Sequence, residues 1–225
     1  MKLTAEQITI IEETLVLKGL IYDDIKLEVT DHIASEIEVA MQENNFSFDD
    51  AFEKAFENWK EQLKLSYSIW TGIKNVAPRI VIEKWESIHR KQNPTIFLFS
   101  LFMTILIIGI LKLLKIENLP ETVTLTTRWF CLALWIFIIA VRVILPKSKH
   151  KTLFGFIFKK RSKIPLNGLG LIVLGLIPNR ILGINSILEI TFDFLVVLLL
   201  MFSISSLKIA YKHFQFERKL SIFKI

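Results

Sequence analysis

The chain has 225 residues, of which 52% are hydrophobic and 18 are phenylalanine, a composition that excludes an ordinary water-soluble domain. The net charge of +6 conceals an uneven distribution. Residues 1–73 hold 15 Asp and Glu against 6 Lys and Arg, whereas the remaining residues hold 7 against 22.

The acidic segment 1–69 predicts a bundle of three amphipathic helices. Thr4 and Gln7 have the spacing of a capping box, and Gly19 is placed to end the first helix. Ser47 and Asp50 can open the third helix in the same way. Apolar residues recur at helical spacing in all three segments, and no alternating strand pattern occurs. We therefore expect an antiparallel helical bundle.

Residues 3–64 also resemble a known kind of domain. The residues that carry the resemblance are Asp31-His32-Ile33, Glu36-Ile37-Glu38, Met41, Phe46-Ser47-Phe48, Ala51-Phe52 and Ala55-Phe56. They are similar to the small helical domains, including permease-prefix and related signalling-type domains, that precede membrane segments in many bacterial proteins. Here no large extracytoplasmic domain or transport-ATPase segment follows. The resemblance implies a regulatory or protein-interaction role and supplies no catalytic residue.

Residues 70–94 predict an amphipathic connector. Val81, Trp85 and Ile88 recur on one face among basic residues, and Pro78 can start a helix. This face either lies at the membrane surface or packs onto the bundle, and the pattern favours neither.

Four membrane-spanning helices are predicted in residues 95–207. Each stretch approaches the roughly 20 apolar residues that cross a bilayer, and the stretches cover residues 95–114, 123–145, 164–184 and 185–207. Gly168, Gly170, Gly175 and Pro178 interrupt the third, so a re-entrant segment is an alternative for it. The expected fold class is thus an all-α integral membrane protein with a cytoplasmic three-helix bundle, an amphipathic connector and four transmembrane helices, followed by a basic tail at 208–225.

The distribution of basic residues predicts the orientation. Lys and Arg near span ends stay on the cytoplasmic side, and 17 of them would lie on one side of the membrane against 4 on the other. Both termini are therefore expected in the cytoplasm, in a bacterial inner membrane. The basic loop beside the spans predicts contact with anionic lipid head groups rather than nucleic acid, through Lys159, Lys160, Arg161 and Lys163.

One predicted site is a docking surface for a protein partner on the acidic second helix. Its residues are Asp31, His32, Glu36, Glu38 and Glu43. The alternative is ordinary solvation of a charged helix face. Glu28, His32 and Glu36 also stack at four-residue spacing, which permits a metal ligand set, but His32 borders an apolar row where a histidine more often seals a core.

A second predicted site is an intramembrane polar group formed by Arg180, Glu189 and Asp193. Charged side chains in a span are costly and often functional, so this group can form a cation or proton site. The alternative, which we favour, is an ion pair near the interface that ties the third span to the fourth.

The sequence supports no reaction. No nucleophile elbow, Walker loop, zinc-protease helix or dinucleotide fingerprint occurs, no cofactor is implied, and Cys131 is the only cysteine. We therefore expect an accessory or signalling protein whose head binds a protein partner and which can form homo-oligomers. A small oligomeric transporter or channel is the alternative. An interfacial lipid enzyme that uses His150 and His213 ranks third.

Overall fold

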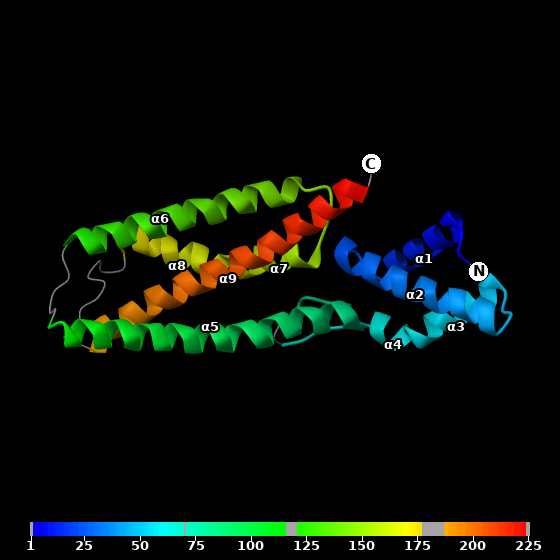
Figure 1. Cartoon of the computed structure of the whole chain (residues 1–225), viewed down its shortest axis with the longest axis horizontal. Coiled ribbons are helices and arrows are strands. Elements are labelled where there is room, and N and C mark those ends of the chain that lie inside the picture. Colours follow the sequence, from blue (N-terminus) through cyan, green and yellow to red (C-terminus); the bar gives the residue numbers. More distant parts are fainter. Residues whose placement is uncertain (1, 70, 116–120, 177–186, 224–225) are drawn as a thin grey trace. The chain divides into compact units, whose positions relative to one another are not determined.

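The computed structural model describes residues 2–69, 71–115, 121–176 and 187–223. This part of the chain is almost entirely helical, as the sequence predicts, and Figure 1 labels its elements. The chain divides into two compact units. The N-terminal unit comprises Met1–His89 and His150–Leu153, and the C-terminal unit comprises Arg90–Lys149 and Phe154–Ile225.

Local capping signals define the helices at the start of the N-terminal unit. Thr4 Oγ1 accepts a hydrogen bond from the Gln7 backbone at 3.3 Å, and the Thr4 backbone donates to Gln7 Oε1 at 2.9 Å. Gly19 has a φ of +88°, which glycine adopts without strain. Ser47 Oγ accepts from the Asp50 backbone at 3.2 Å. The predicted capping box of α1 (Ala5–Leu17) and the predicted cap of α3 (Phe48–Asn58) are thereby confirmed. α2 (Asp23–Glu43) and the short α4 (Lys60–Leu63) have no side-chain cap.

The core of the N-terminal unit follows the apolar rows of these helices. α2 packs against both α1 and α3. The side chains that α1 and α2 bury most completely are Ile11, Leu15, Ile25, Val29, Ile33 and Ile37. Burial of each such side chain contributes about 1.5–3 kcal/mol of hydrophobic stabilisation. The three helices therefore form a core of their own.

The link from this core to the next long helix departs from the sequence-based expectation. Leu65–Ser66 (β1) pairs antiparallel with Ala77–Pro78 (β2), although no strand was expected. A pair of two-residue strands has no room for an alternating pattern, so the sequence carried no signal for it.

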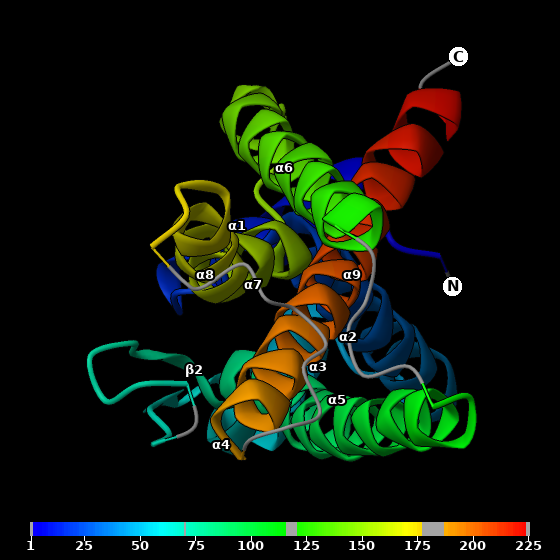
Figure 2. The same ribbon diagram turned by 90° about the vertical axis from the view of Figure 1, so that its left-hand side faces the viewer.

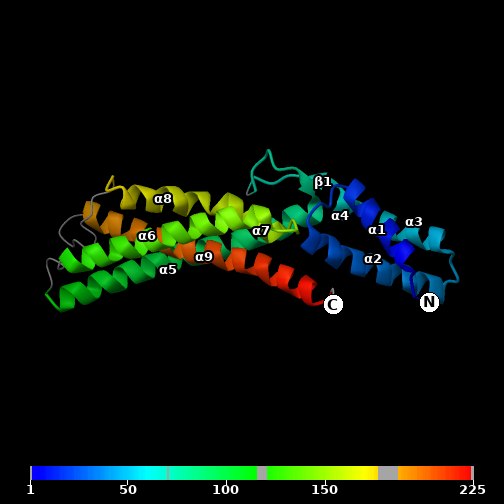
Figure 3. The ribbon, with the colours of Figure 1, turned by 90° about the horizontal axis from the view of Figure 1, so that it is seen from above.

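Helix α5 (Arg79–Leu113) starts immediately after Pro78, where the sequence placed a helix start, and continues past Pro94 (Figure 3). Val81 and Trp85, from the apolar face of the predicted connector, are buried within the N-terminal unit. Lys84 also donates a hydrogen bond to Glu28. This packing favours the second of the two alternatives, in which the connector face lies against the bundle.

Among the described residues, three helices are long and apolar enough to cross a membrane, within Arg79–Leu113, Thr122–Lys147 and Ile187–Ile222. They belong to α5, α6 (Glu121–Ile144, continued by the 3-10 turn Leu145–Lys147) and α9 (Ile187–Phe223). The chain is therefore a multi-pass membrane protein. The third predicted span, over residues 164–184, is not confirmed. α8 (Lys163–Val173) has 11 residues, or about 16 Å of helix, against the ~30 Å of a hydrocarbon core. The second half of the predicted span, from residue 177, lies outside the described residues.

Within the C-terminal unit, α8 packs beside both α6 and α9 (Figure 2). Glycines permit this close packing. A Cβ atom on Gly168 would lie 2.5 Å from Leu199 of α9, and one on Gly170 would lie 3.2 Å from the Trp135 indole nitrogen of α6. The Trp135 indole donates to the Leu166 carbonyl at 2.9 Å. α7 (Leu153–Arg161) precedes α8 and buries Ile157 and Phe158.

Candidate functional site

The predicted docking residues on α2 have different environments. Asp31, His32 and Glu43 are exposed. Glu36 accepts hydrogen bonds from Asn58 and from the Trp59 indole, the latter at 3.0 Å, and so fixes the end of α3. Glu38 accepts from the Leu3 backbone at 2.9 Å and fixes the start of the chain. Two of the five residues therefore have internal partners, and three present polar groups to solvent.

His32 lies against Trp59, with ring centroids 6.2 Å apart and planes inclined by 26°. This contact matches the interpretation of His32 as a residue at the edge of a core. Its neighbour Glu28 pairs with Lys84 instead. Across the described ranges, no group of three His, Cys, Asp or Glu side chains is arranged to hold a metal ion.

The N-terminal unit contains a groove of about 580 Å³ between α1, α3 and α4, which we name the head groove. Phe52 and Phe56 provide its aromatic surface, with ring centroids 4.5 Å apart. The charged residues that line it are Lys18, Glu53, Glu57, Lys60, Glu61 and Lys64. The groove thus combines an apolar surface with a rim of both charge signs, and sequence reasoning did not identify it as a site.

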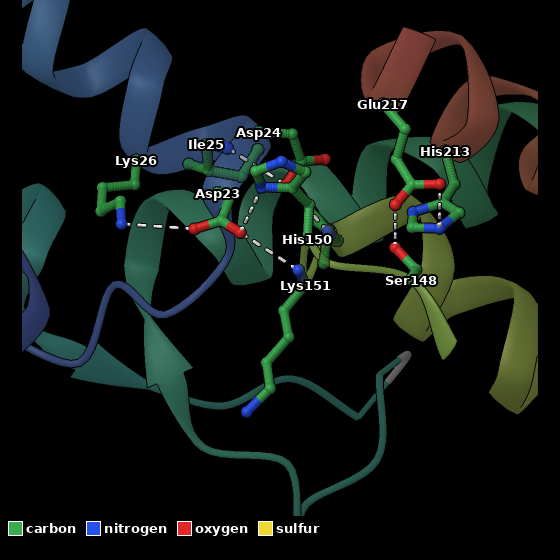
Figure 4. Close-up of polar contacts among 10 residues, drawn as sticks. Asp23, Asp24, Ile25, Lys26, Ser148, His150, Lys151, His213 and Glu217 are labelled. Atoms are coloured by element: carbon green, nitrogen blue, oxygen red, sulfur yellow. Dashed lines mark hydrogen bonds and ion pairs between the residues drawn. The ribbon is translucent and has the colours of Figure 1, made fainter. Parts of the chain in front are cut away.

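A segment from far along the chain packs against the start of α2 (Figure 4). The Asp23 backbone donates to the Lys151 carbonyl at 2.7 Å, and the Lys151 backbone donates to Asp23 Oδ2 at 3.1 Å. His150 Nδ1 lies 3.3 Å from the same carboxylate oxygen, and Lys26 lies 3.2 Å from the other. Asp24 Oδ1 accepts from the Leu153 backbone at 2.8 Å. Residues 150–153 are therefore part of the N-terminal unit.

Burial changes the acid–base properties of two groups at this contact. Desolvation raises the pKa of the Asp24 carboxyl above its ordinary value, although backbone donors from Leu153 and Ile25 oppose the change. Desolvation, with the nearby Asp24 charge, raises the pKa of Tyr22 to about 12. Tyr22 is therefore neutral at physiological pH. No local pattern in the sequence around Asp23 and Asp24 indicated that either carboxylate would bind a distant loop.

The structure describes two of the three residues of the predicted intramembrane group, Glu189 and Asp193. Asp193 is 1% exposed in α9, and Glu189 is half-buried one turn earlier. Arg180 lies outside the described residues. Arg128 of α6 donates to the Val173 carbonyl at 2.9 Å at the end of α8.

The four basic residues predicted to contact lipid head groups differ in their exposure to solvent. Lys159, Lys160 and Lys163 are exposed, whereas Arg161 is 3% exposed. The Arg161 guanidinium lies 4.3 Å from the Phe202 ring centroid, and its Nη2 donates to Ser205 Oγ at 3.4 Å. Desolvation lowers the pKa of Arg161 to about 10, so the group stays cationic at neutral pH.

Two further groups of polar contacts, around Arg142 and Glu217, hold the C-terminal unit. Arg142 donates to the Lys159 carbonyl and to Ser162 Oγ, both at 2.8 Å. Ser148 donates to Glu217, and buried His213 lies 3.9 Å from the same carboxylate, as Figure 4 shows. His150 contacts a carboxylate of the N-terminal unit and His213 one of the C-terminal unit, and neither is fully solvated.

The chain matches no family model, no curated protein and no solved structure. The resemblance of residues 3–64 to permease-prefix and related signalling-type domains therefore stays a prediction.

Proposed function

We propose that this multi-pass membrane protein is an accessory or signalling subunit, whose acidic N-terminal unit binds a protein partner in the cytoplasm of a bacterial cell. The strong excess of Lys and Arg in the predicted cytoplasmic loops supports this orientation. The N-terminal unit has its own core and an acidic surface, which suits a domain outside the bilayer.

The observation that carries the proposal is the head groove. Phe52 and Phe56 are half-buried on its surface, at positions where a helix face that only contacts water would carry polar side chains. An apolar groove with a charged rim fits the apolar face of an amphipathic helix, whose i, i+3 and i+4 side chains enter the groove. The charged rim and the exposed residues of α2 (Asp31, His32 and Glu43) would then select the partner by charge.

Site-directed photo-crosslinking of the full chain in its native membrane tests this function. A benzoyl-phenylalanine at Phe56 lies in the groove, and one at Val39 of α2, which is 50% exposed and does not line the groove, is the matched control. We expect a single crosslinked partner from position 56 and none from position 39. Absence of a crosslink at 56, or the same products at both positions, would refute the proposal.

One observation favours a second function, a small oligomeric transporter or channel. Asp193 is a buried carboxylate within a helix that is apolar enough to span a membrane, and such residues mark ion or proton pathways. Asp193→Asn should then abolish proton or cation flux in proteoliposomes, while Glu189→Gln, one turn nearer the helix end, retains more of it. Unchanged flux in folded Asp193→Asn protein would exclude this function.

A further inference from the structure

A second groove lies between α5 and α9 in the C-terminal unit, with a volume of about 350 Å³. We name it the lysine groove, after Lys91 and Lys208, which line one of its ends and are exposed. Lys91 is the last charged residue before the apolar stretch of α5, and Lys208 is the first charged residue after that of α9. Both helices thus change from apolar to basic along the groove.

The polar end of the groove is strongly positive. Among the described residues, no Asp or Glu lines it. Between the two lysines, Gln92 and Ser205 are joined by a hydrogen bond from Ser205 Oγ to Gln92 Oε1 at 3.1 Å. Two flexible cations beside neutral hydrogen-bonding groups provide the donors that a phosphate accepts from.

A buried cation adds to this charge. Arg161 donates to the same Ser205 hydroxyl that lines the groove. Its Nε and Nη1 atoms are buried and have no hydrogen-bond partner in the described part of the chain. A buried guanidinium without a carboxylate is expensive, and a nearby anion lowers that cost. The Phe202 ring offsets only a part of it.

The other end of the groove is apolar. Ile96 and Phe99 from α5 face Met201 and Ile204 from α9. Phe99 and Ile204 are 47% and 39% exposed in helices that are apolar enough to cross a membrane, so hydrocarbon would cover them. A ligand of matching form has an anionic head at the lysines and an acyl chain along these four side chains.

We propose that the lysine groove binds the phosphate head group and upper acyl chain of an anionic phospholipid. The phosphate lies between Lys91 and Lys208 and accepts from their ammonium groups and from the Gln92 amide NH2, with the Arg161 charge behind the Ser205 hydroxyl. A free phosphate would satisfy the cations but would leave the apolar half of the groove unused, and this selects the lipid. The assignment does not require a protein partner, so it stands apart from the proposed function.

Native mass spectrometry of the full chain in a non-ionic detergent tests the assignment. Phosphatidylglycerol, phosphatidylcholine and inorganic phosphate are titrated separately. One saturable phosphatidylglycerol is expected, bound more tightly than phosphatidylcholine and not displaced by equimolar phosphate. Equal affinity for the two lipids would show that the groove does not distinguish an anionic from a zwitterionic head group. Displacement of the lipid by phosphate would identify a site for a free anion. Either result overturns the proposal.

Charge-matched variants locate the lipid. Lys91→Gln/Lys208→Gln should weaken phosphatidylglycerol binding by about 10- to 30-fold, because each lysine near a membrane surface contributes on the order of a few-fold or more. Lys147→Gln/Lys149→Gln removes two exposed lysines of the same unit that do not line the groove and should change binding less than about 2-fold. Equal losses in both pairs, or none in the first, would overturn the site.

Ser205→Ala provides a variant with no change in charge. It removes the hydroxyl that links Arg161 to Gln92, and we expect binding to weaken by about 5-fold, as for one lost hydrogen bond. Unchanged binding in this variant would show that the link from Arg161 to Gln92 does not contribute to lipid binding, and would contradict the role proposed for Arg161.

Discussion

The two units of this chain differ in the side chains that they expose and in how many polar side chains they bury. The N-terminal unit encloses Ile11, Leu15, Ile33 and their neighbours and presents acidic groups to solvent. The C-terminal unit presents large apolar side chains, such as Phe102 and Ile105 at about 60% exposure, and encloses polar ones. The polar side chains that it buries include Ser100, Thr104, Arg161, Asp193, Ser203, Ser206 and His213. Each unit therefore matches a different solvent, water for the first and lipid for the second.

The largest effect is expected from the removal of a buried side chain from the N-terminal unit. Ile33→Ala should lower the free energy of unfolding of this unit by about 2–5 kcal/mol, because it leaves a cavity among α1, α2 and α3. Pulse proteolysis of the full chain in detergent, at increasing urea, measures the change. Leu27→Ala, at a half-exposed position of the same helix, is the control and should change stability by about 0.5 kcal/mol or less. Equal effects would mean that Ile33 is not part of a water-excluding core.

The next test introduces a charge on the outside of the C-terminal unit. Ile105 is 62% exposed near the middle of the apolar stretch of α5, so Ile105→Asp should cost about 3 kcal/mol of membrane insertion. The measurement is the fraction of chain that resists alkaline carbonate extraction. Leu27→Asp makes the same kind of change on the N-terminal unit and should leave that fraction unchanged. If Ile105→Asp is extracted no more than the wild type, hydrocarbon does not surround this face.

A smaller effect is expected from a carboxylate that fixes two helices of the N-terminal unit to each other. Glu36→Ala removes the acceptor for Asn58 and Trp59 and should lower the free energy of unfolding by about 1–3 kcal/mol. The urea midpoint of the same proteolysis assay reports it. Glu43→Ala, an exposed carboxylate at the end of α2, should stay within about 0.5 kcal/mol of the wild type. A partner lost with Glu43→Ala but not with Glu36→Ala would assign docking to the exposed part of α2.

The smallest effect concerns pH. The pKa of Asp24 is raised in the folded protein, chiefly by desolvation, so folding binds a proton. The resulting stabilisation is fully present below the ordinary carboxyl pKa of 3.8 and is lost as the pH rises through the raised value. Asp24→Asn keeps an acceptor for the Leu153 backbone and should flatten this dependence in urea midpoints measured across that range. Glu43→Gln should leave the slope as it is, and an unchanged slope in Asp24→Asn would contradict the assignment.

Much of the N-terminal unit follows from local sequence signals. The Thr4–Gln7 and Ser47–Asp50 spacings predicted helix starts that the structure confirms, because a cap involves residues only three apart. The apolar row of α2 likewise identified its buried side chains, Ile25, Val29, Ile33 and Ile37. Three of the four predicted spans are helices long and apolar enough to cross a membrane, because composition alone determines that property.

What the sequence missed depends on distant contacts. Nothing near Asp23 or Asp24 indicates that residues 150–153 bind there, since the partners are about 127 residues apart. Arg161 was expected at the lipid surface because it continues a run with Lys159 and Lys160, and periodicity at a helix end cannot tell which of three cations turns inward. The head groove and the lysine groove each combine segments that no local pattern connects.

The position of Arg161 also has a consequence while the chain is being synthesised. Its contacts, Phe202 and Ser205, lie more than 40 residues later in the chain, on the last helix. Until the ribosome has synthesised α9, this guanidinium has neither the ring nor the hydroxyl that shelters it, and Gly168 of α8 has no Leu199 to pack against. A nascent chain that stops before Ile187 therefore leaves the Arg161 guanidinium, and the face of α8 around Gly168, without the contacts that α9 provides. These two features distinguish an unfinished chain from the complete protein.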